Sequence, residues 1–127
     1  MHLLSNLISS IKVANNAKLL KVDSNSSKFC IGVLNNLYKL GYIRGYVVKK
    51  QNKITILLKY ANNLPVIRNI YVVSTPGRRI YLKRSELENN LSRKQGGFYL
   101  VSTSKGIMTD EEAVFLNLGG EVLLKIN

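Results

Sequence analysis

Three consecutive hydroxyl side chains, followed by a lysine and a glycine, are the residues of this sequence best suited to binding chemistry. They come directly after a short apolar, strand-forming run and are Ser102, Thr103, Ser104, Lys105 and Gly106. Hydroxyls both donate and accept hydrogen bonds, lysine supplies a positive charge, and glycine lets a ligand approach the backbone closely. A loop of this composition cannot build a core, so we expect it to contact a ligand rich in acceptors and negative charge. The alternative is an ordinary turn whose hydroxyls bond only to the local backbone.

A second tract, residues 74–81, joins a Pro-Gly turn to basic and aromatic side chains. After the turn come Arg78, Arg79 and Tyr81, and Lys83 follows the tract. The planar fork of arginine suits phosphate oxygens, and a tyrosine can stack on an unpaired base or donate through its hydroxyl. We therefore expect this tract to contact a phosphate-rich ligand, with packing in the core as the alternative for Tyr81.

The carboxylates do not form a catalytic pattern. Glu86 and Glu88 lie in a polar surface turn, and residues 110–112 fill the first turn of a predicted helix, where exposed N–H groups favour acids. Only Glu121, which follows two glycines and begins a strand, lacks such a structural role. The glycine pattern of a phosphate-binding loop is missing before Lys105, and no nucleophile stands beside a matching base. The sequence predicts that the protein is not an enzyme.

Cysteine and histidine are too few for a disulfide framework or a cysteine-based metal site. Cys30 lies among the apolar residues of a predicted helix, where an inert buried thiol is expected, and His2 has no potential metal ligand nearby. We predict no metal, no cofactor and no small-molecule substrate. No apolar run approaches the length of a membrane span, and we expect no cleavable signal or Arg-rich transit segment.

Positive charge dominates the composition. Nineteen Lys and Arg residues stand against seven Asp and Glu, which gives a net charge of +12. The 62 residues between Asp23 and Glu86 contain twelve basic side chains and no acidic one. A polyanion relieves such repulsion, so nucleic acid is the partner that the charge predicts. An anionic membrane surface is the alternative, but the apolar helix faces lack the flanking Trp or Phe anchors that it requires.

Hydrophobic periodicity predicts a small α+β protein of 127 residues, 46% of them hydrophobic. We expect one helix at 3–13, a second between a cap at Ser26 or Ser27 and a stop at Gly41, and a third at 110–117, where Thr109 and Glu112 form a capping box. A helical turn is expected at 85–91. Strands are expected at 19–22, 43–48, 54–60, 66–73, 79–82, 98–102 and 121–126.

A break in the pattern at residues 62–65 is the preferred boundary between two small lobes. Lobe 1–63 is expected to hold the N-terminal helices packed on a short sheet. Lobe 64–127 is expected to be a mostly antiparallel β lobe with a short helix, and to carry both candidate binding tracts.

The hydroxyl tract and its surroundings resemble the family of small-subunit ribosomal protein eight, of bacterial or organellar type. The stretch reads Leu-Val-Ser-Thr-Ser-Lys-Gly-Ile-Met-Thr-Asp at 100–110 and Asn-Leu-Gly-Gly-Glu-Val-Leu at 117–123. Residues 74–81 resemble the family's Ser-basic-Pro-Gly-x-Arg-x-Tyr element, with Thr75 in place of the basic residue. In the first helix, residues 10–13 read Ser-Ile-Lys-Val where the family commonly has Arg-Ile-Arg-Asn, so only Lys12 keeps a positive charge there.

The resemblance implies a structural protein that binds the central domain of small-subunit rRNA and supports its assembly, with neighbouring small-subunit ribosomal proteins as further partners. It implies that the loop from Ser102 to Lys105 meets a distorted site within an rRNA helix, supported by Tyr81 and Glu121. The candidate RNA-binding set is completed by Gly106, Arg78, Arg79, Lys83 and Lys12. A translational repressor that acts on messenger RNA is the alternative function, because some bacterial members bind their own message.

The amino-acid composition indicates the type of genome that encodes the protein, and hence its cellular location. Asn, Ile, Lys and Tyr make up 45 of the 127 residues, and Lys outnumbers Arg by 13 to 6. These amino acids have AT-rich codons, which are typical of organellar and some bacterial genomes. We expect an organelle-encoded protein of the mitochondrial ribosome, with a plastid or the bacterial cytoplasm as alternatives.

Overall fold

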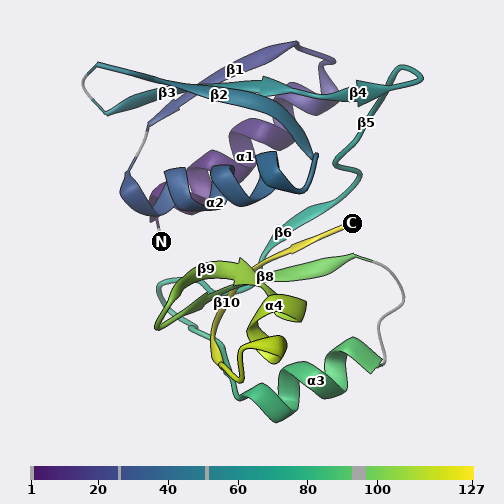
Figure 1. The fold of residues 1–127 in the computed structure, drawn as a ribbon. Helices are drawn as coiled ribbons and strands as arrows, with labels where there is room; N and C mark the ends of the chain where they lie inside the picture. The colour runs from purple at the N-terminus through teal and green to yellow at the C-terminus, as the bar shows by residue number, and fades with distance from the viewer. Residues whose placement is uncertain (1, 26, 51, 93–96) are drawn as a thin grey trace. The chain divides into compact units, whose positions relative to one another are not determined.

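The computed structural model describes residues 2–25, 27–50, 52–92 and 97–127. The chain divides into two compact units, Met1–Arg68 and Asn69–Asn127. Residues 62–65, where the sequence analysis places its boundary, contribute to a short hairpin inside the first unit. The architecture is α+β, as predicted, with helices and a sheet in the first unit and an antiparallel sheet with short helices in the second (Figure 1).

The first unit packs two helices on one face of an antiparallel sheet of order β1-β3-β2 (Figure 1). Its elements are α1 (His2–Asn16), β1 (Lys21–Asn25), α2 (Lys28–Lys39), β2 (Ile43–Lys49), β3 (Lys53–Leu58), β4 (Tyr60–Ala61) and β5 (Leu64–Pro65).

Apolar periodicity explains why this unit folds in this way. The face of α1 that carries Leu4, Leu7 and Ile11 is buried, and so is the face of α2 with Val33 and Leu37. Ile54, Ile56 and Leu58 alternate along β3 and are buried, as expected for a strand covered on one face.

The limits of α2 were predicted correctly. The Ser27 side chain accepts a hydrogen bond from the Cys30 N–H and so caps the first turn. Gly41, with φ +83°, follows the C-cap residue Leu40 and ends the helix. Cys30 is fully buried, in agreement with an inert structural thiol.

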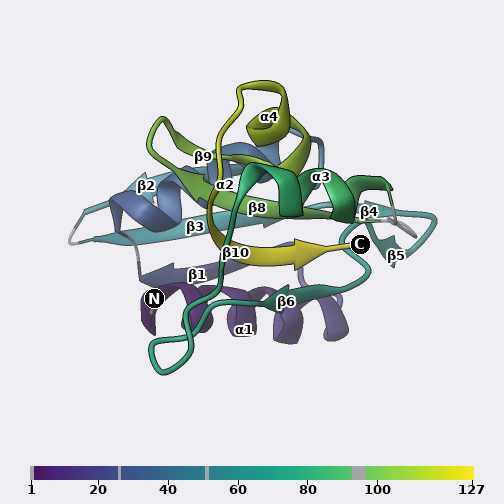
Figure 2. The ribbon, with the colours of Figure 1, turned by 90° about the horizontal axis from the view of Figure 1, so that it is seen from below.

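The second unit is a sheet of order β6-β10-β8-β9 in which β7 also pairs with β10. Figure 2 shows β10 between β6 and β8. Two helices, α3 and α4, belong to the same unit. Its elements are β6 (Ile70–Val72), β7 (Tyr81–Leu82), α3 (Arg84–Ser92), β8 (Phe98–Thr103), β9 (Gly106–Thr109), α4 (Asp110–Phe115) and β10 (Gly120–Ile126).

A cluster of buried side chains joins α3, α4 and one face of this sheet. Val101, Met108 and Val122 lie opposite one another on three neighbouring strands, and Leu87 and Ala113 from the helices complete the cluster. The hydroxyl tract is therefore held by a packed core at the end of β8.

Three predictions of elements need correction. The strand predicted at 66–73 is shorter than expected, because only Ile70–Val72 forms a strand and pairs with β10. The helical turn predicted at 85–91 is a full helix, α3, because the Glu86 carboxylate accepts a hydrogen bond from the Lys83 N–H and caps its start. The loop expected after residue 102 is a hairpin, because β9 returns from it along β8.

Candidate functional site

The hydroxyl tract is the tip of the β8–β9 hairpin. Thr103 faces Gly106 across the hairpin, so only Ser104 and Lys105 lie between the two strands, and both are exposed. Gly106 has φ +116°, a backbone conformation that side chains rarely adopt, and it therefore lets β9 turn back directly. The tip presents one hydroxyl and one ammonium group at the end of a paired hairpin.

Thr103 has a different role from its neighbours. Its hydroxyl donates to the Gly106 carbonyl at 2.9 Å and accepts from the Lys105 N–H at 3.2 Å. Both bonds lie within the turn, which is the alternative that the sequence left open for such hydroxyls. Thr103 therefore shapes the tip, while Ser104 and Lys105 are its exposed polar residues.

The turn at residues 75–78 is fastened to β10 by a buried serine. The Ser74 hydroxyl is fully buried, donates to the Val122 carbonyl at 2.6 Å and accepts from the Ile80 N–H at 3.0 Å. The backbone groups of Thr75 and Arg78 bond to each other at 3.0 Å in both directions and close the turn. This arrangement holds Arg78 and Arg79 in the exposed part of the unit. The role of Ser74 is not predictable from the sequence, because a buried serine looks like any other turn serine there.

Strand register brings the two candidate tracts together. Glu121 on β10 lies opposite Tyr81 on β7 and opposite Ser102 on β8. Residues directly opposite one another in antiparallel strands point to the same face of the sheet. Tyr81, Glu121 and Ser102 therefore form a continuous row, which we call the binding row.

Exposure within the binding row is uneven. The Tyr81 side chain is 64% exposed, which excludes the alternative that it packs in the core. The Glu121 side chain is only 12% exposed. Its Oε1 lies 3.8 Å from the Arg79 Nη1, and its Oε2 is buried without a hydrogen-bond partner among the described residues. A buried acceptor without a partner is costly, so Glu121 retains an unused capacity to accept a hydrogen bond.

Two glycines permit the close strand packing on which the binding row depends. A Cβ at Gly120 would lie 2.1 Å from the Ser102 carbonyl oxygen, and one at Gly119 would lie 2.6 Å from that of Leu82. Both obstacles are backbone atoms, which cannot move aside as a flexible side chain can. The Gly-Gly pair therefore sets the distance of β10 from β7 and from the hydroxyl tract.

The remaining predicted contacts are more dispersed. Lys83 is exposed and directly precedes α3, two residues beyond Tyr81. Lys12 is exposed on α1 and belongs to the first unit, so it is not part of the binding row.

Charge is divided unequally between the units. Residues 1–68 carry eleven of the nineteen basic residues and one acid, Asp23, for a net charge of +10. Residues 69–127 carry eight basic and six acidic residues, for a net charge of +2. The binding row thus lies in the nearly neutral unit, and the strong positive potential belongs to the other.

Several acids of the second unit other than Glu121 have structural roles. Glu88 accepts from Arg84 at 2.6 Å along α3, and the Thr109 hydroxyl accepts from the Glu112 N–H at 3.2 Å in the predicted capping box. Asp110 is buried and accepts from the Tyr99 N–H, which ties α4 to β8. Within the described residues, no group of three or more His, Cys, Asp or Glu side chains could hold a metal ion. In the same part of the chain, no helix is long and apolar enough to cross a membrane.

Comparison with known proteins decides the family. The model of the family described as ribosomal protein S8 matches residues 2–127. The chain belongs to the ribosomal protein S8 family. This match confirms the predicted family resemblance. Because proteins of the S8 family are structural and not enzymatic, family membership also confirms the predicted lack of enzyme activity.

Similar members of the S8 family come from mitochondrial and bacterial lineages. The chain is 61% identical over 127 residues to small ribosomal subunit protein uS8m of Acanthamoeba castellanii, with 100% of both chains covered. It is 39% identical over 127 residues to uS8 of Rhodospirillum centenum, covering 97% of this chain and 95% of the relative. It is 36% identical over 126 residues to uS8 of Rickettsia massiliae, covering 96% and 94%.

Proposed function

We propose that this protein is a structural constituent of the small subunit of the mitochondrial ribosome, where it binds the central domain of the small-subunit rRNA and supports its assembly. The S8 family membership supports the ribosomal role, and the 61% identity to a uS8m protein supports the mitochondrial location. The observation that carries the rRNA site is the binding row, in which Tyr81, Glu121 and Ser102 lie side by side next to the exposed Ser104 and Lys105.

The chemistry of the binding row suits irregular RNA. Hydroxyl groups can bond to ribose 2′-OH groups and to base edges, and an exposed tyrosine ring can stack on an unpaired base. A regular duplex offers mainly phosphates, which lysine and arginine contact without regard to sequence. Ser102, Ser104 and Tyr81 therefore supply selectivity, while Arg78, Arg79, Lys83 and Lys105 bind phosphates beside them.

Glu121 adds selectivity by exclusion. A carboxylate repels phosphate oxygens, and its unpartnered Oε2 needs a donor. Amino groups of bases and ribose hydroxyls are the donors that RNA offers. An RNA that presents one of them opposite Glu121 satisfies a buried acceptor, whereas an RNA that presents phosphate leaves it unsatisfied.

The first unit supplies sequence-independent affinity. Its net charge of +10 attracts any RNA, and release of counterions makes the binding salt-dependent. If about six phosphates are engaged, affinity falls on the order of a thousandfold between 50 and 200 mM salt. Neighbouring small-subunit ribosomal proteins are further partners in this proposal.

A filter-binding titration at moderate salt tests the proposal. It compares central-domain RNA from a mitochondrial small subunit with an unrelated structured RNA of equal length. We expect a preference of about a hundredfold, which corresponds to about 2.7 kcal/mol. Equal affinity for the two RNAs would refute site-specific binding.

Loop variants locate the source of the preference. Ser102→Ala combined with Ser104→Ala is expected to reduce binding to the central-domain RNA and to leave binding to the unrelated RNA almost unchanged. Ser9→Ala combined with Ser85→Ala removes two exposed hydroxyls outside the binding row and serves as the control. Equal losses on both RNAs would show that the hydroxyl tract does not provide selectivity.

A further inference from the structure

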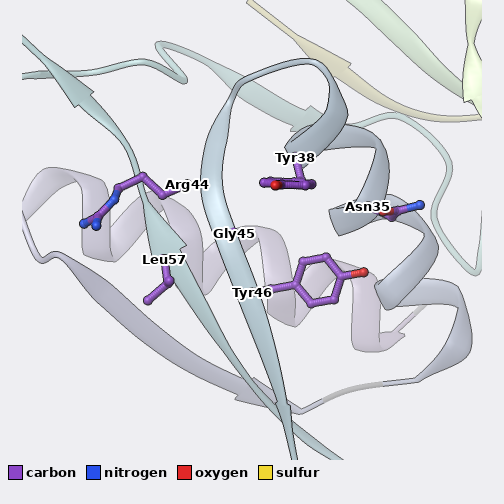
Figure 3. Close-up of a pocket in the computed structure, with 6 residues that line it drawn as sticks. All are labelled: Asn35, Tyr38, Arg44, Gly45, Tyr46 and Leu57. Carbon is purple, nitrogen blue, oxygen red and sulfur yellow. The ribbon is translucent and has the colours of Figure 1, made fainter.

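A groove in the first unit lies outside the binding row. It has a volume of about 440 Å³ and is lined by Asn35, Tyr38, Arg44, Gly45, Tyr46 and Leu57. In Figure 3 the two tyrosines and the α2 residue Asn35 lie on one side of β2, and Arg44 and Leu57 lie on the other. The groove therefore passes over β2 at Gly45.

An irregularity in β2 creates the crossing point. Ile43 lies opposite Leu58 and Gly45 opposite Leu57, so the register shifts there and Arg44 is the additional residue. Such bulges redirect side chains and are frequent beside binding sites. Gly45 has φ +158°, and a Cβ placed on it would meet no atom within 4 Å, so the space above the backbone is open at the crossing.

The polar groups around this groove are free to bind. Among the described residues, no hydrogen bond or ion pair engages the side chains of Asn35, Tyr38, Arg44 or Tyr46. The Tyr38 side chain is 53% exposed although it stands on a helix whose other large apolar residues are mostly buried. The exposed Tyr38 ring thus lies on the same side of β2 as Asn35, and the Arg44 guanidinium lies on the other side of the strand.

The net positive charge of the first unit indicates a negatively charged ligand for this groove. The groove lies in the unit that carries eleven basic residues and one acid, so its surroundings favour a polyanion. An aromatic ring stacks on a nucleobase, an amide can pair with a base edge, and a guanidinium binds a phosphate in bidentate fashion. A single nucleotide presents all three partners.

We propose that this groove binds one unpaired nucleotide of RNA, with its base against Tyr38 and Tyr46, its base edge near Asn35 and its phosphate on Arg44. The proposal rests on the proposed function in that RNA is the ligand, but it places a second contact in the first unit, separate from the binding row. That contact depends on stacking, and not on charge alone.

Titration of the 127-residue chain with a short unstructured RNA of about eight nucleotides, monitored by fluorescence anisotropy, tests this contact without the central-domain RNA. Tyr38→Leu removes the ring but keeps an apolar side chain, and we expect affinity to fall at least about fivefold, the lower end for loss of one base–aromatic stack. Tyr38→Phe keeps the ring and is expected to bind like the unmodified chain. Because Tyr38 is exposed, neither change removes core packing.

Arg44→Gln is compared with Lys39→Gln, which removes the same charge from a neighbouring exposed position outside the groove. We expect the larger loss for Arg44→Gln. Ultraviolet cross-linking followed by trypsin digestion is expected to attach the nucleotide to peptides 29–39 or 45–49, which contain the two tyrosines.

Two results would overturn the groove proposal. One is oligonucleotide affinity that is unchanged in Tyr38→Leu and falls equally in Arg44→Gln and Lys39→Gln. The other is a groove variant that binds the oligonucleotide normally but no longer binds a neighbouring ribosomal protein, which would assign the groove to a protein partner. Failure of the proposed function is recognised separately, because it appears as equal affinity of the unmodified chain for central-domain and unrelated RNA.

Discussion

Replacement of Ser74 by alanine is expected to destabilise the second unit and to disorganise the arginine turn. The hydroxyl is fully buried and forms hydrogen bonds with the Ile80 N–H at 3.0 Å and the Val122 carbonyl at 2.6 Å. Its removal leaves the buried Val122 carbonyl and the partly buried Ile80 N–H without this partner, and an unsatisfied buried group costs about 1–3 kcal/mol. We expect the free energy of unfolding to fall by about 2–4 kcal/mol, a large share of the roughly 5–15 kcal/mol of a typical protein.

Urea unfolding followed by circular dichroism measures this loss. Ser104→Ala is the matched control, because it deletes the same atom from an exposed serine at the hairpin tip. The control is expected to leave the unfolding midpoint unchanged but to reduce selectivity for central-domain RNA, whereas Ser74→Ala lowers the midpoint. Equal midpoints for Ser74→Ala and the unmodified chain would refute the argument that the buried hydroxyl fastens the turn to β10.

Three further predictions follow from the geometry and the charges. The first concerns the basic side chains at the β2–β3 turn, which are Lys49, Lys50 and Lys53. Their joint replacement by alanine is expected to lower the steepness of the plot of log affinity against log salt by up to about 2.7, at about 0.9 per phosphate contact. An unchanged slope would show that this turn does not touch RNA. Gly120→Ala pushes a Cβ against the Ser102 carbonyl and should abolish selectivity while binding to unrelated RNA persists, so a variant with normal selectivity would contradict the close-packing argument. The pKa of Asp23 lies below 3.8, chiefly because the Thr55 hydroxyl donates to it and secondarily because Lys49 is near. The stabilising effect of the ionised Asp23 carboxylate is therefore present above about pH 3.8 and is lost as the pH falls through the lowered pKa. Carboxyl NMR titration should show that Thr55→Val raises the pKa of Asp23 more than Lys49→Ala does. The reverse order would contradict the assignment of the Thr55 hydrogen bond as the main cause.

Local sequence signals predicted most of the elements. The capping box at Thr109, the cap at Ser27 and the glycine stop at Gly41 depend on neighbouring residues, and each appears where expected. Strand β9 was missed because only Ile107 and Met108 give it apolar character, and it is held by pairing with β8. Pairing of this kind depends on residues that meet only in the folded chain.

The candidate site was predicted by residue type but not by arrangement. The sequence left open whether Tyr81 packs in the core. In the structure Tyr81 lies opposite Glu121 and its side chain is exposed, which no local sequence signal indicates. The sequence grouped Thr103 with its neighbouring serines, but the hairpin turns its hydroxyl inward. The groove over Gly45 depends on a register shift in β2 and on the approach of α2, which no linear motif reports.

The division of charge between the units, +10 in residues 1–68 and +2 in residues 69–127, has a consequence for rates. Long-range attraction accelerates encounter, whereas short-range hydrogen bonds and stacking govern how long a complex survives. The first unit should therefore set the association rate, which falls with added salt, and the binding row should set the dissociation rate, which responds to salt much less. A nascent ribosomal particle would capture the protein through the first unit and retain it through the second, so capture and retention can change independently.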